Sequence, residues 1–156
     1  MESMNWIWGL SLIALTVAIH TTGIVMTALV GLAITLRWEQ TRPLGLRHVI
    51  PMVIGMSASI GLELAVLHGI EATIWAAAYV WLGALDSPKN AILYSIDSLT
   101  TRGASGLMLP PNWQMMGALE AADGMLLFGM STAYIFAVML AYWPMLSKPF
   151  MTGRPQ

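Results

Sequence analysis

Six ionisable side chains lie within long apolar segments of the sequence, where charge is costly and a functional role is the first hypothesis. Two of them, His68 and Glu71, are three residues apart and share a helix face with Trp75 and Tyr79. Imidazole and carboxylate groups can ligate a metal, but one His-x-x-Glu pair without a second cluster is a weak signature. We therefore expect no metal site and interpret His68 and Glu71 as an outer-helix polar cluster, hydrogen-bonded near the outer membrane interface.

The other four ionisable residues admit more than one interpretation. His20 is expected to be a satisfied interior histidine in preference to a proton relay. Glu63 lies on a different face from His68 and closer to mid-membrane, so it is either paired with a polar group on a neighbouring helix or protonated. Glu120 and Asp123 begin the last apolar segment, where they either stabilise the helix start or form a cation-attracting ring.

Several classes of function are excluded by composition. The chain has no cysteine, so disulfides, thiolate metal sites and cysteine nucleophiles are absent. Its net charge of -1 argues against a nucleic-acid partner. The sequence offers no phosphate-binding loop, nucleophile triad or paired-carboxylate motif. We expect a protein that is not an enzyme and has no cofactor, apart from permeant K⁺ or another monovalent ion.

The elements that position these residues are three long apolar segments, at 6–36, 49–85 and 115–146. Residues are 57% hydrophobic and 10% charged, and the mean hydropathy is +0.70. Each segment exceeds the roughly 20 residues that a helix needs to cross a bilayer. A soluble protein of this length could not bury three such helices. The sequence therefore predicts an all-α membrane protein with three transmembrane helices and membrane lipids as partners.

Positive charges predict the orientation of the chain. Arg37, Arg42 and Arg47 lie between the first two segments, and Lys148 and Arg154 lie in the C-terminal tail. Both regions should be cytoplasmic by the positive-inside rule. The prediction is a multi-pass protein with its N-terminus outside and its C-terminus in the cytoplasm.

The segment at 89–113 is not expected to span the membrane. Residues 90–101 form a plausible short helix capped by Ser87 or Asn90, with Pro88 nearby. The residues that follow cannot continue as helix because they are rich in helix breakers: Gly103, Gly106, Pro110 and Pro111. A half-helix that points its carbonyl end at a central cavity attracts cations, as in a channel pore loop. An ordinary extracellular loop is the alternative interpretation.

Residues 91–103, 107–117 and 119–133, together with the upstream His68-x-x-Glu71 pattern, resemble a known family. This is the small bacterial tetrameric potassium-channel family, of the two-pore-domain or ion-channel-2 type. The resemblance implies a re-entrant pore helix and a filter-like loop, a homotetramer, and residence in the bacterial inner membrane. It also implies Gly124 and Gly129 as hinges in the inner helix.

The resemblance assigns the pore and filter to seven consecutive residues: Thr100, Thr101, Arg102, Gly103, Ala104, Ser105 and Gly106. It makes Thr101 the innermost hydroxyl, followed by the carbonyls of Arg102 and Gly103. The pattern then departs from the family, because Ala104 stands for the filter tyrosine, Ser105 for the second glycine and Gly106 for the aspartate. Ser105 in a glycine-type conformation would cost about 1 kcal/mol per subunit. The filter is therefore degenerate.

Four guanidinium groups of Arg102 near one axis would repel each other and passing cations. Asp97 lies five residues earlier and is the expected filter support, pairing with Arg102 within a subunit or across to its neighbour.

These expectations divide the chain into three parts. Residues 1–85 form two N-terminal transmembrane helices with a basic loop at 37–48, residues 86–146 form the pore helix, loop and inner helix, and 147–156 form a cytoplasmic tail. The expected function is passive ion permeation, cation-preferring and poorly selective for K⁺. The alternative is a non-conducting accessory or structural subunit, which would co-assemble with an intact channel subunit.

Overall fold

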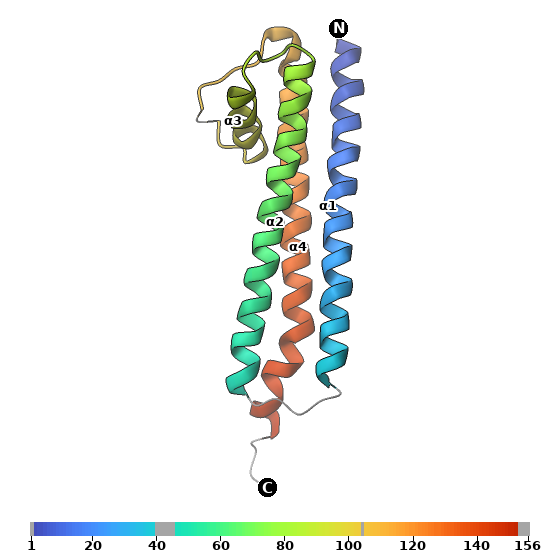
Figure 1. Ribbon diagram of the computed structural model, residues 1–156, viewed down its shortest axis with the longest axis vertical. Coiled ribbons are helices and arrows are strands. Elements are labelled where there is room, and N and C mark those ends of the chain that lie inside the picture. Colours follow the sequence, from blue (N-terminus) through green and yellow to red (C-terminus); the bar gives the residue numbers. More distant parts are fainter. Residues whose placement is uncertain (1, 40–45, 104, 153–156) are drawn as a thin grey trace.

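Three long helices run side by side, and a short fourth helix packs against one end of the bundle (Figure 1). This computed structural model describes residues 2–39, 46–103 and 105–152. The long helices are α1 (Glu2–Glu39), α2 (Leu46–Trp81) and α4 (Gln114–Thr152), and the short one is α3 (Pro88–Leu99). A single 3-10 turn, Pro111–Trp113, precedes α4. The described part of the chain is all-helical, as predicted.

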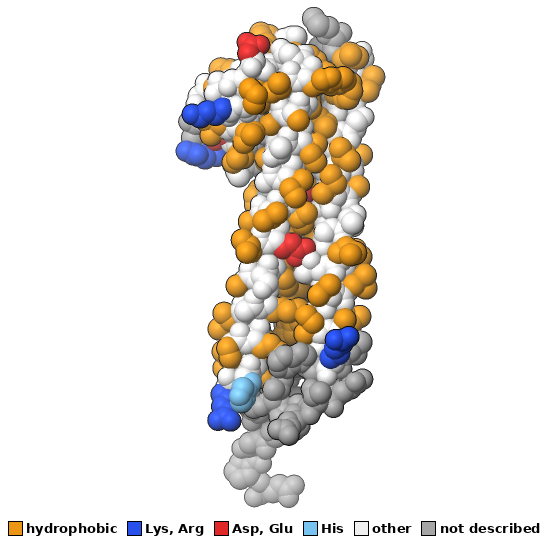
Figure 2. Space-filling view, viewed as in Figure 1, with side chains coloured by type: hydrophobic (Ala, Val, Ile, Leu, Met, Phe, Trp, Pro, Cys, Tyr) orange, Lys and Arg blue, Asp and Glu red, His pale blue; other side chains and the backbone are white. Residues whose placement is uncertain are grey.

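The long helices provide three candidate membrane spans, at Ser3–Ile34, Arg47–Trp81 and Pro111–Pro144, and the last of these includes the 3-10 turn before α4. Few residues in these spans are buried within the chain, and many large apolar side chains point outwards. Figure 2 shows hydrophobic side chains over the whole shaft, whereas the Lys and Arg side chains in this view lie towards its ends. An apolar shaft of this length suits lipid and not water. The three predicted spans and the membrane assignment are confirmed at this level.

Two helix ends differ from the prediction. The helix α2 ends at Trp81 and not at residue 85, because Gly83 adopts a left-handed φ of 69° and the Ala84 amide donates to the Tyr79 carbonyl at 2.8 Å. At the other end, α4 continues to Thr152, so the predicted tail from residue 147 begins as helix.

The start and the faces of α3 follow from its sequence. Ser87 caps the helix by accepting the Asn90 amide at 3.4 Å, and Pro88 occupies the first turn, as predicted. One face is buried against the bundle, and it consists of Ala91, Ser95, Asp97 and Leu99. The other face is exposed and apolar, and it includes Ile92, Leu93 and Ile96.

Contacts with α4 show that α3 descends from the end of the bundle into its length. Tyr94 packs at Gly117, near the start of α4, and Leu99 packs at Gly124, further along. At 1.5 Å per residue, Gly124 lies about 15 Å along α4 from its first residue, Gln114. The chain after Leu99 then returns to the end where α4 begins (Figure 1). The short helix and its loop therefore lie alongside the bundle, not across its tip.

A side chain at position 124 should disturb this packing. A Cβ added to Gly124 would lie 2.7 Å from the carbonyl carbon of Leu99, and rigid backbone cannot give way as a flexible side chain could. We expect Gly124→Ala to destabilise the protein by about 1–3 kcal/mol, measured by thermal unfolding in detergent. The matched control is Gly129→Ala, because nothing lies within 4 Å of that position in the chain. The control should be neutral or slightly stabilising, and equal losses in both variants would contradict the packing argument.

Candidate functional site

The segment after α3 has an irregular backbone, in which three of the described residues are left-handed. Their φ angles are 53° at Thr101, 61° at Gly103 and 69° at Gly106. Glycine adopts this conformation readily, whereas a β-branched residue such as Thr101 does so only under constraint. That constraint comes from two backbone hydrogen bonds, in which the amides of Thr101 and Arg102 donate to the Ser98 and Asp97 carbonyls, both at 2.9 Å. The predicted filter entrance thus has a specified shape.

Asp97 holds this loop in place. Its carboxylate is 5% exposed, and Oδ2 accepts the Ser105 amide at 2.8 Å. Its Oδ1 lies 3.9 Å from Nε of Arg102, whose side chain is 66% exposed. The predicted pairing is therefore present within one chain, but as a long and solvated contact that contributes little. The Ser105 amide is the stronger partner, and sequence reasoning did not foresee it.

Two predictions about the loop remain untested. Ala104 lies outside the described residues, so neither its side chain nor the backbone strain expected at Ser105 is tested. The hinge assignments also stay predictions, because α4 is one continuous helix through Gly124 and Gly129. For Gly124 the structure gives another reason for glycine, which is the contact with Leu99.

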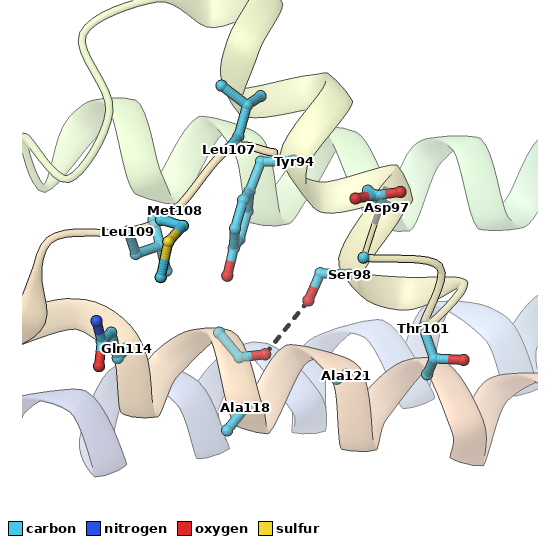
Figure 3. A pocket seen from close by; sticks show the side chains of 12 residues that line it. Tyr94, Asp97, Ser98, Thr101, Leu107, Met108, Leu109, Gln114, Ala118 and Ala121 are labelled. Carbon is cyan, nitrogen blue, oxygen red and sulfur yellow. Dashed lines mark hydrogen bonds between the residues drawn. The ribbon is translucent and has the colours of Figure 1, made fainter. Parts of the chain in front are cut away.

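A hollow of about 500 Å³ lies between the loop, α3 and α4 (Figure 3). Tyr94, Leu107 and Met108 line it on the side of α3 and the loop, and Ala118 and Ala121 line it on α4. On its α3 side, the Ser98 hydroxyl donates to the Gly117 carbonyl at 3.3 Å. Burial raises the pKa of the Tyr94 hydroxyl, and the nearby Glu120 carboxylate acts in the same direction, so this phenol stays neutral.

A second group of polar residues lies inside the three-helix bundle. We call it the polar column and define it by its members: His20 on α1, His68 and Glu71 on α2, and Glu120, Asp123 and Ser131 on α4. The α2 members continue the face that also carries Trp75 and Tyr79, as the sequence predicted. Except for the partly buried His68, every member of the column is buried, although all lie within candidate spans.

The carboxylates of α4 are held by donors on the other two helices. The Tyr79 hydroxyl donates to Glu120 Oε2 at 2.8 Å, and the Trp75 indole donates to Asp123 Oδ2 at 2.9 Å. The Thr16 hydroxyl on α1 donates to the same Asp123 oxygen at 2.7 Å. Glu120 is 0% and Asp123 1% exposed, so both face the interior of one chain. This burial is at odds with the predicted cation ring, because a ring needs a surface that several chains share.

The histidines, Glu71 and Ser131 form a closed ring of four contacts. Nδ1 of His20 lies 2.8 Å from Glu71 Oε1, and Nδ1 of His68 lies 3.1 Å from Glu71 Oε2. Both Nε2 atoms face the Ser131 hydroxyl, at 3.0 Å from His20 and 3.2 Å from His68. His68 and Glu71 are in contact as predicted, but the contact is not a hydrogen bond, because Glu71 Oε2 has no hydrogen-bond partner among the described residues. His20 is a satisfied interior histidine. Sequence reasoning missed that His20 and Ser131 complete the same cluster.

The remaining acid of the spans, Glu63, accepts a hydrogen bond from the Thr27 hydroxyl on α1. Of the two interpretations left open by the sequence, the contact with a polar group on a neighbouring helix is present, and the protonation of Glu63 stays untested. Like the ring around Glu71, this contact ties α2 to α1.

Comparison of the chain with models of protein families, with curated proteins and with solved structures finds no match.

The anchoring role of Asp97 predicts different effects for two substitutions. Asp97→Ala removes the acceptor of the Ser105 amide, at a cost of about 1.5–3 kcal/mol, so the loop amides should exchange with solvent tenfold faster or more. Asp97→Asn keeps a side-chain oxygen as acceptor, so the loop amides of this variant should exchange much more slowly than those of Asp97→Ala. Arg102→Leu should have little effect, because the ion pair is long and exposed. Equal acceleration in Asp97→Asn and Asp97→Ala would show that charge, and not this hydrogen bond, holds the loop.

The bond between Tyr79 and Glu120 predicts a loss of stability on its removal. Tyr79→Phe leaves the buried Glu120 without that donor, and we expect a cost of about 1–3 kcal/mol in thermal unfolding. Tyr134→Phe on α4 is the matched control, since the structure gives its hydroxyl no hydrogen bond among the described residues. A cost in the control as large as that in Tyr79→Phe would contradict the assignment.

Proposed function

We propose that four copies of this chain assemble around a common axis as a potassium-channel-like pore in the bacterial inner membrane. The pore passes ions passively, prefers cations and selects K⁺ poorly. The N-terminus lies outside and the C-terminus in the cytoplasm. The short helix α3 and the loop at 100–110 form the lining of the pore on its outer side, and α4 forms the inner helix.

The descent of α3 along α4 is the observation that carries this proposal. With its flanking helices crossing the bilayer, a helix that ends about 15 Å along α4 would lie below the outer membrane surface. The described residues of the loop that follows show no regular hydrogen-bonding pattern. Irregular backbone at that depth is tolerated only where protein covers it or water fills a cavity. An assembly around a shared axis meets both conditions, because neighbouring copies would cover the sides of the loop and the pore would fill with water.

The outer faces of α3 and the loop favour contact with another copy. Ile92, Leu93 and Ile96 are each more than 40% exposed in the single chain, and Met108 on the loop is 77% exposed. Lipid could cover these apolar side chains, but it could not satisfy the peptide groups beside them. A neighbouring subunit serves both needs.

The charges near the loop support cation preference with weak selectivity. The carbonyl end of α3 carries partial negative charge, and the hydroxyls of Thr100 and Thr101 lie beside it. Both threonine side chains are exposed. The exposed guanidinium of Arg102 opposes this attraction. The acids of the polar column belong to the bundle of each chain and take no part in the proposed filter.

Conductance and copy number test the proposal together. Purified protein in planar bilayers should give single-channel currents whose reversal potential favours cations only moderately. Arg102→Leu should raise the cation conductance and shift the reversal potential towards that of K⁺. Arg47→Leu is the matched control, because Arg47 is exposed at the opposite end of α2. Mass measurement in nanodiscs should give four copies.

Two results would overturn the pore. A copy number other than four would rule out the proposed fourfold pore. Four copies without current would favour a non-conducting structural subunit that keeps the assembly.

A further inference from the structure

We propose that His20, His68 and Glu71 bind a divalent transition-metal ion of the class that prefers imidazole and carboxylate ligands, such as Zn²⁺. This site lies in the bundle of each chain and goes beyond the proposed pore. The two histidines come from different helices, α1 and α2, so a bound ion would clamp those helices together. The sequence analysis expected no metal site, because it considered only His68 and Glu71 as ligands, and this inference reverses that expectation.

The three side chains lie close to the required spacing. One ligand atom from each lies within 4.8 Å of the others. A tetrahedral ion with ligands at 2.0–2.2 Å holds those atoms about 3.3–3.6 Å apart. The two contacts between Nδ1 and the Glu71 carboxylate are 2.8 and 3.1 Å. Binding therefore lengthens these two contacts by a few tenths of an ångström, and it draws the most widely separated ligand atoms together by up to about 1 Å. His68 is further fixed by stacking on Phe128, with ring centroids 4.3 Å apart.

The charge balance of the bundle favours a bound cation. The three candidate spans contain four carboxylates, and the sequence has no Lys or Arg at 3–34, 48–81 or 111–144. Buried carboxylates need a nearby positive charge or a proton. A divalent ion bound by Glu71 would neutralise that carboxylate and offset one further negative charge in the bundle.

An orphaned oxygen in this cluster gives an independent argument. Oε2 of Glu71 is buried and has no hydrogen-bond partner among the described residues, although Nδ1 of His68 lies 3.1 Å away. A buried carboxylate oxygen without a donor is costly, and a metal ligand role would satisfy it. With a metal on both Nδ1 atoms, each Nε2–H would donate to one lone pair of the Ser131 oxygen. Ligating histidines are typically oriented by such a hydrogen bond from the second nitrogen.

Cobalt serves as the spectroscopic probe of this site. Wild-type protein in detergent is stripped with a chelator and titrated with Co²⁺. We expect visible absorption of low-coordinate Co²⁺ that saturates at one ion per chain. His20→Asn and Glu71→Gln should abolish this absorption. Ser131→Ala should weaken binding by about 10–100-fold, as for other residues that orient metal ligands. His48→Asn is the matched control, because His48 is exposed near the start of α2 and should leave binding unchanged.

A second measurement requires no variant. Zn²⁺ should raise the thermal unfolding temperature of the stripped wild-type protein, and the chelator should reverse the rise. Absence of both the Co²⁺ bands and the Zn²⁺ shift overturns the site, as does equal Co²⁺ uptake by His20→Asn and wild type. Neither readout depends on ion current, so a protein that binds Co²⁺ without conducting would retain this site and lose the pore.

Discussion

The structure depends on burying acidic side chains between apolar helices that carry no Lys or Arg at 3–34, 48–81 or 111–144. Each such carboxylate must find a hydrogen-bond donor, a proton or a cation inside the bundle. Tyr79, Trp75 and Thr16 supply donors to the acids of α4, Thr27 donates to Glu63, and His20 contacts Glu71. Removing any one of these partners leaves charge in a low-dielectric interior, so the polar column tolerates little change.

The same contacts also define which helices meet and in what register. In lipid, apolar surface does not distinguish one helix pairing from another, so polar contacts and close packing must do so. Asp123 joins α4 to both other long helices, and Glu71 with His20 joins α2 to α1. Because these bonds recur along the bundle axis, a slip of one turn would break several of them at once. The buried acids therefore specify the pairing and register of the helices, although their burial costs free energy.

Much of this architecture could be predicted from sequence, because the dominant signals are local. The three apolar segments, the cap at Ser87 and the shared face of His68 and Glu71 depend on neighbouring residues. What could not be predicted was which residues of different helices meet. The residues near His20 and Ser131 in the sequence do not indicate that these two side chains belong to one cluster. The spacing of Glu120, Asp123 and Ser131 does place these three residues on one face of α4. The end of α2 was also missed, because Gly83 was not recognised as a left-handed stop.

The close approach of Leu99 to Gly124 has a mechanical consequence. The helix α4 is uninterrupted from this contact to Thr152, at the opposite end of the molecule. Because α4 meets the backbone of α3 at Gly124, with no flexible side chain between the two helices, a rotation of α4 would be passed on to α3. Torque applied at the far terminus would thus reach Thr100 and Thr101 directly.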